Sequence, residues 1–285
     1  MDVLDLIKKE GLRRGLSHRT ISSYCYCVKL FMKACSKDPK RITKRDIKDY
    51  ASMLIEKGYC GNTLNVYISA LKFFFEEILC RKLLLYIKYS KVPKELPTVL
   101  TKEEVRILFN AIRNKKHSLM IRLMYSAGLR LSELANLKIK DLEFDKNYGW
   151  VRKGKGNKDR LFVIASSLQS ELKGFAESEN LEYEDWLFRG RNSHISQKTI
   201  YEIVKRAAKK TGIKKNVHPH TLRHSFATHL IEDGYDIASV QSLLGHNSSE
   251  TTMRYIHMAS PKLINVKSPY DTLNQNTSHV DPESL

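Results

Sequence analysis

Two histidine-containing segments and one tyrosine near the C-terminal end bring acid–base groups close to a fixed cation. The first segment reads His220-Thr221-Leu222-Arg223-His224, the second reads Leu244-Gly245-His246, and Tyr255 follows nine residues after His246. Histidine titrates near neutral pH, arginine stays charged, and a phenol becomes a nucleophile when it loses its proton. Together these groups could attack and protonate a phosphate ester.

A second arginine and a lysine lie upstream. Arg130 follows Gly128-Leu129, and Lys155 lies in Gly154-Lys155-Gly156-Asn157-Lys158, a sequence typical of a tight turn. A phosphodiester under attack needs its equatorial oxygens neutralised, and its leaving oxygen must be protonated. Arg130 and Arg223 are candidates for the first task because a planar guanidinium bonds two oxygens at once. Lys155, on a flexible turn, is the candidate acid for the 5′ oxygen.

His220 and Tyr255 are the candidate base and nucleophile. His220 lies three residues before Arg223, close to a helix start indicated by Pro219, so both side chains can share one face. A phenol has a pKa near 10 and needs cations and a base beside it to react. The other members of the set would supply both.

His246 and Glu133 complete the set. His246 follows a predicted helix end at Gly245 and could donate a hydrogen bond to a phosphate oxygen. Glu133, three residues after Arg130, could bind that arginine and hold it in place without touching the phosphate, or could be a solvated helix charge. The predicted catalytic residues are therefore Arg130, Lys155, His220, Arg223, His246 and Tyr255.

A metal site is the main alternative for the histidines. His218, His220, His224 and His229 have spacings that metal ligands also use. No cysteine lies nearby, and Pro219 separates the first pair, so we expect no metal. His224 and His229 fit better as helix-packing residues. The glycines around Lys155 do not form an ATP-binding loop, so we expect no cofactor.

Length and charge indicate what must position these residues. A chain of 285 residues favours two domains. The net charge of +18 is spread along it, with +10 over residues 1–92 and +8 over residues 93–285. A polyanion that contacts both halves explains this distribution, although a basic protein without such a partner would share it.

Apolar periodicity predicts a helical domain over 1–88 and a mixed domain over 101–260. In the first, Ser17, Thr43 and Asn62 are predicted helix starts. Residues 89–100 contain Pro93 and Pro97 and read as an extended linker that would let two domains close around a duplex.

The second domain should combine helices with a small antiparallel sheet. We expect helices over 101–114, 118–127, 196–210, 220–233, 236–244 and 251–257, and strands within 139–164. The predicted fold class is therefore mainly α with a small antiparallel β-sheet (α+β). Residues 261–285 read as a polar C-terminal tail that could contact another subunit.

Cysteine usage and the N-terminal sequence bear on location. All five cysteines fall in the first third and read as core thiols in a reducing cytosol. The sequence suggests neither a signal peptide nor a membrane span, so a cytoplasmic location is expected.

These motifs, in this order, resemble those of the tyrosine recombinases, most closely the Xer type. The resemblance includes the stand-alone archaeal members of that type. The resemblance covers roughly residues 100–257, and the helical domain before it is similar to the family's core-binding domain. It rests on four segments and Tyr255; the segments are Ala127-Gly128-Leu129-Arg130-x-Ser132-Glu133-Leu134, Gly154-Lys155-Gly156-Asn157-Lys158-Asp159-Arg160, His220-x-x-Arg223-His224-Ser225-Phe226-Ala227-Thr228-His229 and Leu243-Leu244-Gly245-His246.

The resemblance implies a reaction. Tyr255 would attack a DNA phosphate to give a 3′-phosphotyrosyl link and a free 5′ hydroxyl. Arg130, Arg223 and His246 would hold the phosphate, with His220 as base and Lys155 as acid. The enzyme would act as a tetramer on double-stranded DNA with a near-palindromic site, that of chromosome-dimer resolution, with neither metal nor nucleotide.

Other functions remain open on the sequence. An integrase of a mobile element would use the same residues, a type IB topoisomerase would use the same chemistry without a site, and a DNA-binding protein would need no Tyr255. A metal-dependent nuclease would lose cleavage on chelation. Pro269 and the polar residues after it depart from the family's C-terminal helix, which leaves the subunit contact least supported.

Overall fold

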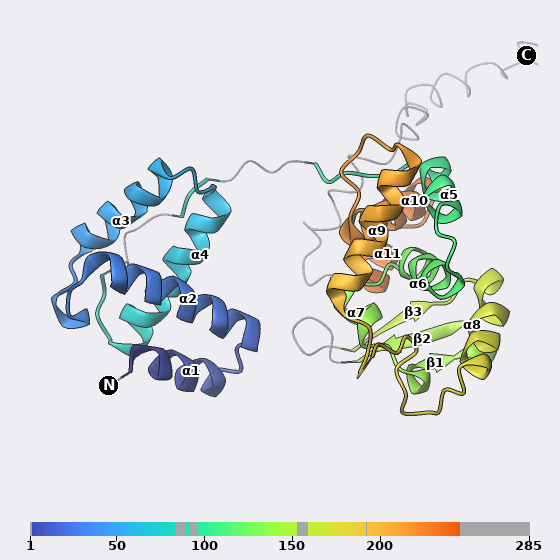
Figure 1. Cartoon of the computed structure of the whole chain (residues 1–285), viewed down its shortest axis with the longest axis horizontal. Helices are drawn as coiled ribbons and strands as arrows, with labels where there is room; N and C mark the ends of the chain where they lie inside the picture. Colours follow the sequence, from blue (N-terminus) through green and yellow to red (C-terminus); the bar gives the residue numbers. More distant parts are fainter. Residues whose placement is uncertain (1, 84–88, 92–95, 153–158, 192, 246–285) are drawn as a thin grey trace, which may run out of the picture. The chain divides into compact units, whose positions relative to one another are not determined.

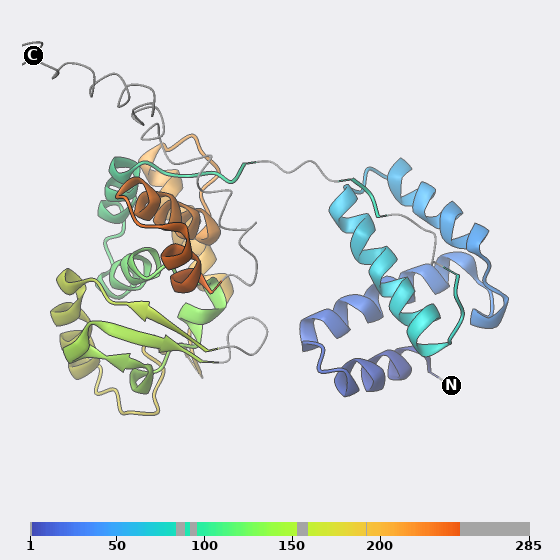
Figure 2. The same cartoon turned by 180° about the vertical axis from the view of Figure 1, so that it is seen from behind.

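The chain divides into two compact units, Met1–Glu95 (unit 1) and Leu96–Leu285 (unit 2), each described here by itself. The computed structural model (Figures 1 and 2) describes residues 2–83, 89–91, 96–152, 159–191 and 193–245. Within these ranges no helix is both long and apolar enough to cross a lipid bilayer.

The described residues of unit 1 form a bundle of four α-helices. They are α1 (Val3–Arg13), α2 (His18–Cys35), α3 (Lys44–Glu56) and α4 (Gly61–Lys72), with a 3₁₀ turn at Pro39–Arg41. The predicted caps at Ser17 and Thr43 are confirmed: each hydroxyl accepts from a backbone N–H in the first turn of its helix, and Thr43 forms a capping box with Asp46. The third predicted start, Asn62, was wrong by two residues, because the N-cap of α4 is Cys60 and the helix begins at Gly61.

The core of unit 1 is aromatic. After α4 the backbone forms a π-helix over Phe73–Ile78. In this wider helix the three successive side chains Phe73, Phe74 and Phe75 are all buried in the core. Phe75 packs edge-on against Phe31 of α2. The cysteines only partly match the sequence prediction: Cys27 is buried, but Cys60 and Cys80 are exposed thiols.

Unit 2 packs helices around a small sheet. Its α-helices are α5 (Lys102–Asn110), α6 (Lys115–Ser126), α7 (Leu131–Ala135), α8 (Ser166–Ser178), α9 (Gln197–Thr211), α10 (Pro219–Glu232) and α11 (Ile237–Leu244), with 3₁₀ turns at Ile139–Asp141 and Phe144–Lys146. The buried helix α6 contacts α8 on one side and α10 on another, and the core runs between them.

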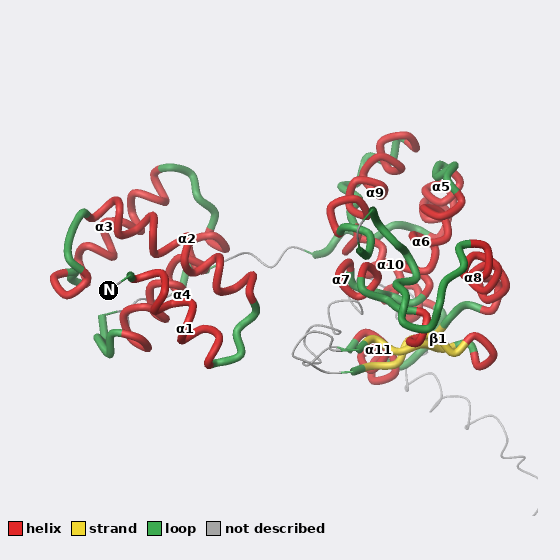
Figure 3. Tube along the Cα trace, turned by 60° about the horizontal axis from the view of Figure 1, so that its bottom comes forward, coloured by secondary structure: helices red, strands yellow, loops and turns green. Residues whose placement is uncertain are grey.

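The sheet is antiparallel with the order β1-β2-β3, where β1 is Leu142–Glu143, β2 is Tyr148–Val151 and β3 is Arg160–Val163 (yellow in Figure 3). Val151 pairs with Arg160, so residues 152–159 form the connection between β2 and β3 that carries Lys155. Below that connection Arg152 donates to Asp159 over 3.1 Å. The helix α11 packs against β3. This confirms the predicted fold class, mainly α with a small antiparallel sheet.

Several sequence predictions in unit 2 were inexact. The helix predicted over 101–114 ends at Asn110, because Asn114 instead caps the next helix, and that helix begins at Lys115 rather than 118. The predicted strand residues Ile139 and Phe144 lie in 3₁₀ turns instead. Helix α8 was not predicted, because its apolar residues Leu168, Leu172 and Ala176 alternate with a polar Ser- and Glu-rich face that reads as loop.

Several predictions lie outside the described residues. They concern Lys155, His246, Tyr255, Pro93, the helix over 251–257 and the tail over 261–285. The described parts of the linker, 89–91 and 96–100, contain no helix or strand.

His229 ties the last long helix to the start of unit 2. Its imidazole lies 2.9 Å from the Leu100 carbonyl through Nε2 and 2.7 Å from the Tyr125 hydroxyl through Nδ1. A carbonyl only accepts, so Nε2 carries the hydrogen and Nδ1 accepts from Tyr125. This agrees with the packing role expected from the sequence.

We predict that acid weakens unit 2 through His229. Burial lowers the pKa of His229 below its ordinary value, so the folded protein binds this proton less readily than the unfolded chain. The stabilisation is therefore present above about pH 6.5 and is lost as the pH falls below it. In urea unfolding at pH 8 and pH 5.5, wild type should lose more stability than His229→Gln, which keeps an N–H donor but does not titrate. Equal losses would contradict this.

Candidate active site

A buried carboxylate, Glu133 in the short helix α7, is the centre of the predicted site. Its Oε2 accepts from the backbone N–H of Arg130 over 2.9 Å, and its Oε1 accepts from Nη1 of the same residue over 2.6 Å. Gly128, with φ of +56°, ends the preceding turn, and its position against Phe226 leaves no room for a Cβ. The backbone of Arg130 is therefore fixed, and Glu133 holds its side chain as the sequence suggested.

Arg160 is a second arginine on the same carboxylate. Nη2 of Arg160 donates to Glu133 Oε2 over 2.6 Å, and Nη1 donates to the carbonyl of Leu243. Arg160 was not among the predicted site residues, although it belongs to one of the motifs that carry the family resemblance. The available signal was its place on β3, where alternation puts a charged residue at an inward-facing position between Asp159 and Leu161.

Arg223 is the third arginine of the cluster. It is almost completely buried in α10, and its guanidinium donates to the carbonyls of Gly128 and Leu244. Nη1 lies 3.9 Å from Glu133 Oε2. Arg130 and Arg223 were predicted to act together, and the fold brings them to one carboxylate.

The three arginines also share the C-terminal end of α11. Arg160 donates to the carbonyl of Leu243, Arg223 to that of Leu244 and Arg130 to that of Gly245, the last over 3.1 Å. The last carbonyls of a helix have no partner within the helix and carry partial negative charge. Three guanidiniums that donate to three successive carbonyls therefore fix the end of α11. The last of these carbonyls belongs to Gly245, the residue before His246.

Gly245 is needed for this arrangement in two ways. Its φ of +60° is left-handed, and an added Cβ would lie 2.6 Å from Cδ of Arg160. A side chain at this position would therefore displace the arginine as well as strain the helix end.

The charges of the cluster do not balance. Burial alone would raise the pKa of Glu133, but the charge of Arg160 and hydrogen bonds from Arg160 and Arg130 lower it below its ordinary value. One ionised carboxylate thus faces three guanidiniums. Among the described residues of the cluster this leaves two positive charges, which suits the binding of an anion such as a phosphate.

His220 lies at the start of α10, in the first turn below Arg223. Desolvation of its packed side, followed by the charges of Arg223 and Arg130, lowers the pKa of His220. The side chain of His220 is exposed, and the lowered pKa favours the neutral imidazole, which is the form that a general base requires.

The other histidines give no metal centre among the residues that the structure describes. The rings of His218 and His220 lie 6.2 Å apart, and those of His220 and His224 6.4 Å apart. His229 is engaged by Leu100 and Tyr125.

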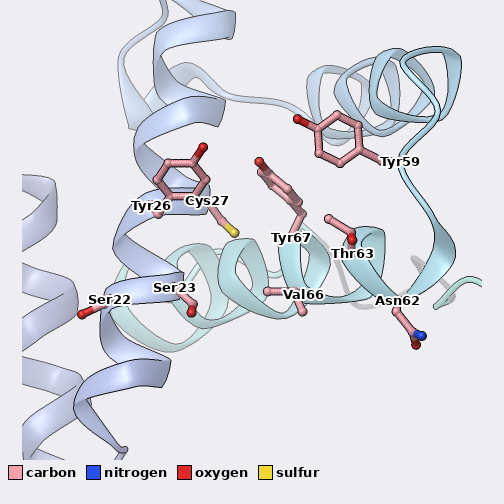
Figure 4. Close-up of a pocket in the computed structure, with 9 residues that line it drawn as sticks. All are labelled: Ser22, Ser23, Tyr26, Cys27, Tyr59, Asn62, Thr63, Val66 and Tyr67. Atoms are coloured by element: carbon pink, nitrogen blue, oxygen red, sulfur yellow. The ribbon is translucent and has the colours of Figure 1, made fainter. Parts of the chain in front are cut away.

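Unit 1 contains a separate hollow of about 540 Å³ between α2 and α4. Figure 4 shows its lining, which comes from α2 on one side and from α4 with the turn before it on the other. The lining has hydroxyl, amide, thiol and apolar groups but no charge; it consists of Ser22, Ser23, Tyr26, Cys27, Tyr59, Asn62, Thr63, Val66 and Tyr67. Burial raises the pKa of the Cys27 thiol to about 11, so this sulfur stays protonated.

Two family models match the sequence and together span most of it. Residues 98–261 match the phage integrase family, and residues 4–84 match the phage integrase N-terminal SAM-like domain.

Known proteins similar to the chain include recombinases from archaea and bacteria. "Tyrosine recombinase XerA" of Pyrococcus horikoshii is 38% identical over 87% of this chain and 86% of its own length, and "Integrase/recombinase" of Escherichia coli is 32% identical over 97% and 95%. The structure is similar to that of the XerH site-specific recombinase bound to its palindromic difH substrate after cleavage, with a TM-score of 0.73, 27% identity, and coverage of 90% of this chain and 82% of that one.

We predict that Glu133→Gln strongly destabilises unit 2. The change leaves buried guanidiniums without their counter-charge, which should lower the free energy of unfolding by about 3 kcal/mol or more. Glu103→Gln is the matched control: Glu103 pairs with Arg106 at the exposed surface of α5, and its loss should cost less than about 1 kcal/mol. Urea unfolding measures both, and similar losses for the two variants would contradict the central role of Glu133.

Proposed function

Because this chain belongs to the phage integrase family of tyrosine recombinases, we propose that Tyr255 is the nucleophile with which it cleaves DNA. The family reaction is a transesterification that cleaves and rejoins DNA at specific sites, and the chain is an enzyme of this class. The observation that carries the assignment of its residues is the arginine cluster on Glu133, which has positive charge in excess where a phosphate is to be bound.

In the proposed first step the Tyr255 oxygen forms a bond to phosphorus and the bond to the 5′ oxygen breaks. Arg130 and Arg223, with His246, stabilise the charge on the equatorial oxygens. His220 takes the phenol proton, and Lys155 gives a proton to the leaving 5′ oxygen. The products are a 3′-phosphotyrosyl link and a free 5′ hydroxyl.

Rejoining reverses this step with the 5′ hydroxyl of another strand. One phosphoester replaces another, so the energy of the broken bond is retained and nucleotide hydrolysis is not required. Exchange between two duplexes cuts four strands, which is why we propose a tetramer in the synapse. The tail over 261–285 is a proposed subunit contact.

The proposed substrate is double-stranded DNA with a near-palindromic site. XerH, which is similar over most of this chain, is described as bound to a palindromic substrate. We propose resolution of chromosome dimers as the biological role, with integration of a mobile element as the alternative, since the E. coli relative is named an integrase/recombinase. We also propose a cytoplasmic location.

The uncharged hollow of unit 1 is a candidate reader of base sequence. Along one face of α2, Arg19 and Lys29 flank Ser22, Ser23 and Tyr26 at helical spacing. Both cations are exposed, and neither forms an ion pair with a described residue. In proteins that read DNA sequence, cations bind the phosphates, and uncharged donors and acceptors beside them contact the base edges.

Covalent trapping tests the nucleophile. Wild type and Tyr255→Phe are each mixed with fragmented genomic DNA from the source organism, with and without EDTA, and DNA that stays bound through denaturant is sequenced. We expect adducts from wild type alone, unaffected by EDTA and clustered at one locus, which would also identify the site. Absence of an adduct would favour a DNA-binding protein, loss with EDTA a metal-dependent nuclease, and adducts scattered over the genome a type IB topoisomerase.

Two substitutions separate base reading from phosphate binding in unit 1. On DNA that carries the trapped site, Asn62→Ala should weaken specific binding by about 1–3 kcal/mol and leave binding to unrelated DNA unchanged. Lys29→Ala should weaken both equally and reduce the salt dependence by about one counterion. Titrations at several salt concentrations measure both, and an equal effect of Asn62→Ala on both DNAs would exclude base reading by this residue.

A further inference from the structure

Arg160 occupies a position that the fold otherwise gives to an apolar side chain. Along β3 the burial alternates, with Arg160 and Phe162 facing inward and Leu161 and Val163 facing out. Phe162 is completely buried, and Arg160 is 9% exposed. By this alternation an aliphatic residue would be expected at position 160.

Stability does not explain an arginine there. Burial lowers the pKa of the Arg160 guanidinium by more than the charge of Glu133 raises it, so this cation, although still charged, is less favourably placed here than in water. Its Nε is buried and has no hydrogen-bond partner among the described residues. A well-packed apolar side chain would often stabilise such a site at least as well as a buried ion pair.

The contacts of Arg160 show what it changes for Arg130. Both residues donate to Glu133, Arg130 mainly to Oε1 and Arg160 to Oε2. If Glu133 faced Arg130 alone, one carboxylate would neutralise one guanidinium. With Arg160 on the second oxygen, the carboxylate is shared, and the pair Arg130–Glu133 keeps positive character.

We propose that Arg160 is a positioning residue that engages Glu133 and the end of α11, so that the charge of Arg130 remains available to the scissile phosphate. The residue does not touch the phosphate in this proposal. It acts through Glu133, and through the Leu243 carbonyl it holds α11 in register with β3. This inference rests on the proposed function, in which Arg130 binds the phosphate.

The charge on the phosphate provides the test. In a methylphosphonate a methyl group replaces one non-bridging oxygen, so the scissile group is neutral while the bond to the 5′ oxygen is unchanged. A residue that maintains the positive potential of the site matters for a charged phosphate and much less for a neutral one. A residue that only supports the fold affects both substrates equally.

The experiment measures single-turnover cleavage by Arg160→Met and wild type on two duplexes that carry the trapped site, one with a phosphate and one with a methylphosphonate at the cleaved position. We expect Arg160→Met to lower the rate at least about tenfold on phosphate but less than about threefold on methylphosphonate. The ratio of the two rates comes from one protein preparation, so a partly unfolded sample does not change it. Arg160→Lys, which keeps the charge, should restore much of the ratio.

Arg122→Met is the matched control. Arg122 is an arginine of unit 2 that is less buried than Arg160 and, like it, pairs with one acid, here Glu171, and has a buried Nε without a partner among the described residues. It joins α6 to α8 through Glu171 and does not donate to Glu133, so its substitution should leave the ratio at the wild-type value.

Two results would overturn the proposal. An equal loss on both substrates would reduce Arg160 to a structural role. A third duplex with sulfur in place of the 5′ oxygen, whose thiolate leaves without a proton, detects the other case: full recovery of Arg160→Met on this DNA would mean that the residue acts through the leaving-group acid instead. If wild type itself cleaves none of the duplexes, the proposed function fails rather than this inference.

Discussion

The structure of unit 2 depends on one buried carboxylate. Glu133 faces the guanidiniums of Arg130, Arg160 and Arg223, which come from three separate elements of unit 2. A buried carboxylate is tolerated away from water only when such partners are in place. The charge geometry therefore constrains three elements together. They are the turn at Gly128, two residues before Arg130, the inward face of β3, and the first turns of α10. Packing of the apolar core brings these elements near one another, but the charge geometry fixes their register.

The end of α11 adds a second constraint to the first. A helix of only eight residues has little stability of its own, and its last carbonyls need donors. The arginines provide those donors, so the same groups that face Glu133 also determine where α11 stops. In the proposed function the residues that follow carry His246 and Tyr255. The groups that would bind the phosphate and the segment that would attack it are thus connected through the backbone of α11.

Much of this could be predicted from sequence because the signals are local. The capping hydroxyls of Ser17 and Thr43, the glycine stops and the change from helical to alternating periodicity near β1 each depend on a few neighbouring residues. The association of Arg130, Glu133 and Arg223 was predictable from chemistry, because phosphate binding needs paired cations. Arg160 was missed because its role comes from a partner on α7, and nothing within its own strand reveals that contact. The boundary between α5 and α6 was missed because Asn114 reads equally well as a last or a first residue.

The close approach of Gly245 to Arg160 has a consequence for how such sequences can change. A side chain at 245 meets Cδ of the arginine, and a shorter residue at 160 would leave the Leu243 carbonyl without its arginine donor and Glu133 Oε2 with only the backbone N–H of Arg130. A substitution of Gly245 is therefore harmful while Arg160 is present, and a substitution of Arg160 is harmful while Gly245 is present. The two positions should show strong epistasis, and in an alignment of relatives they should either both be retained or change together.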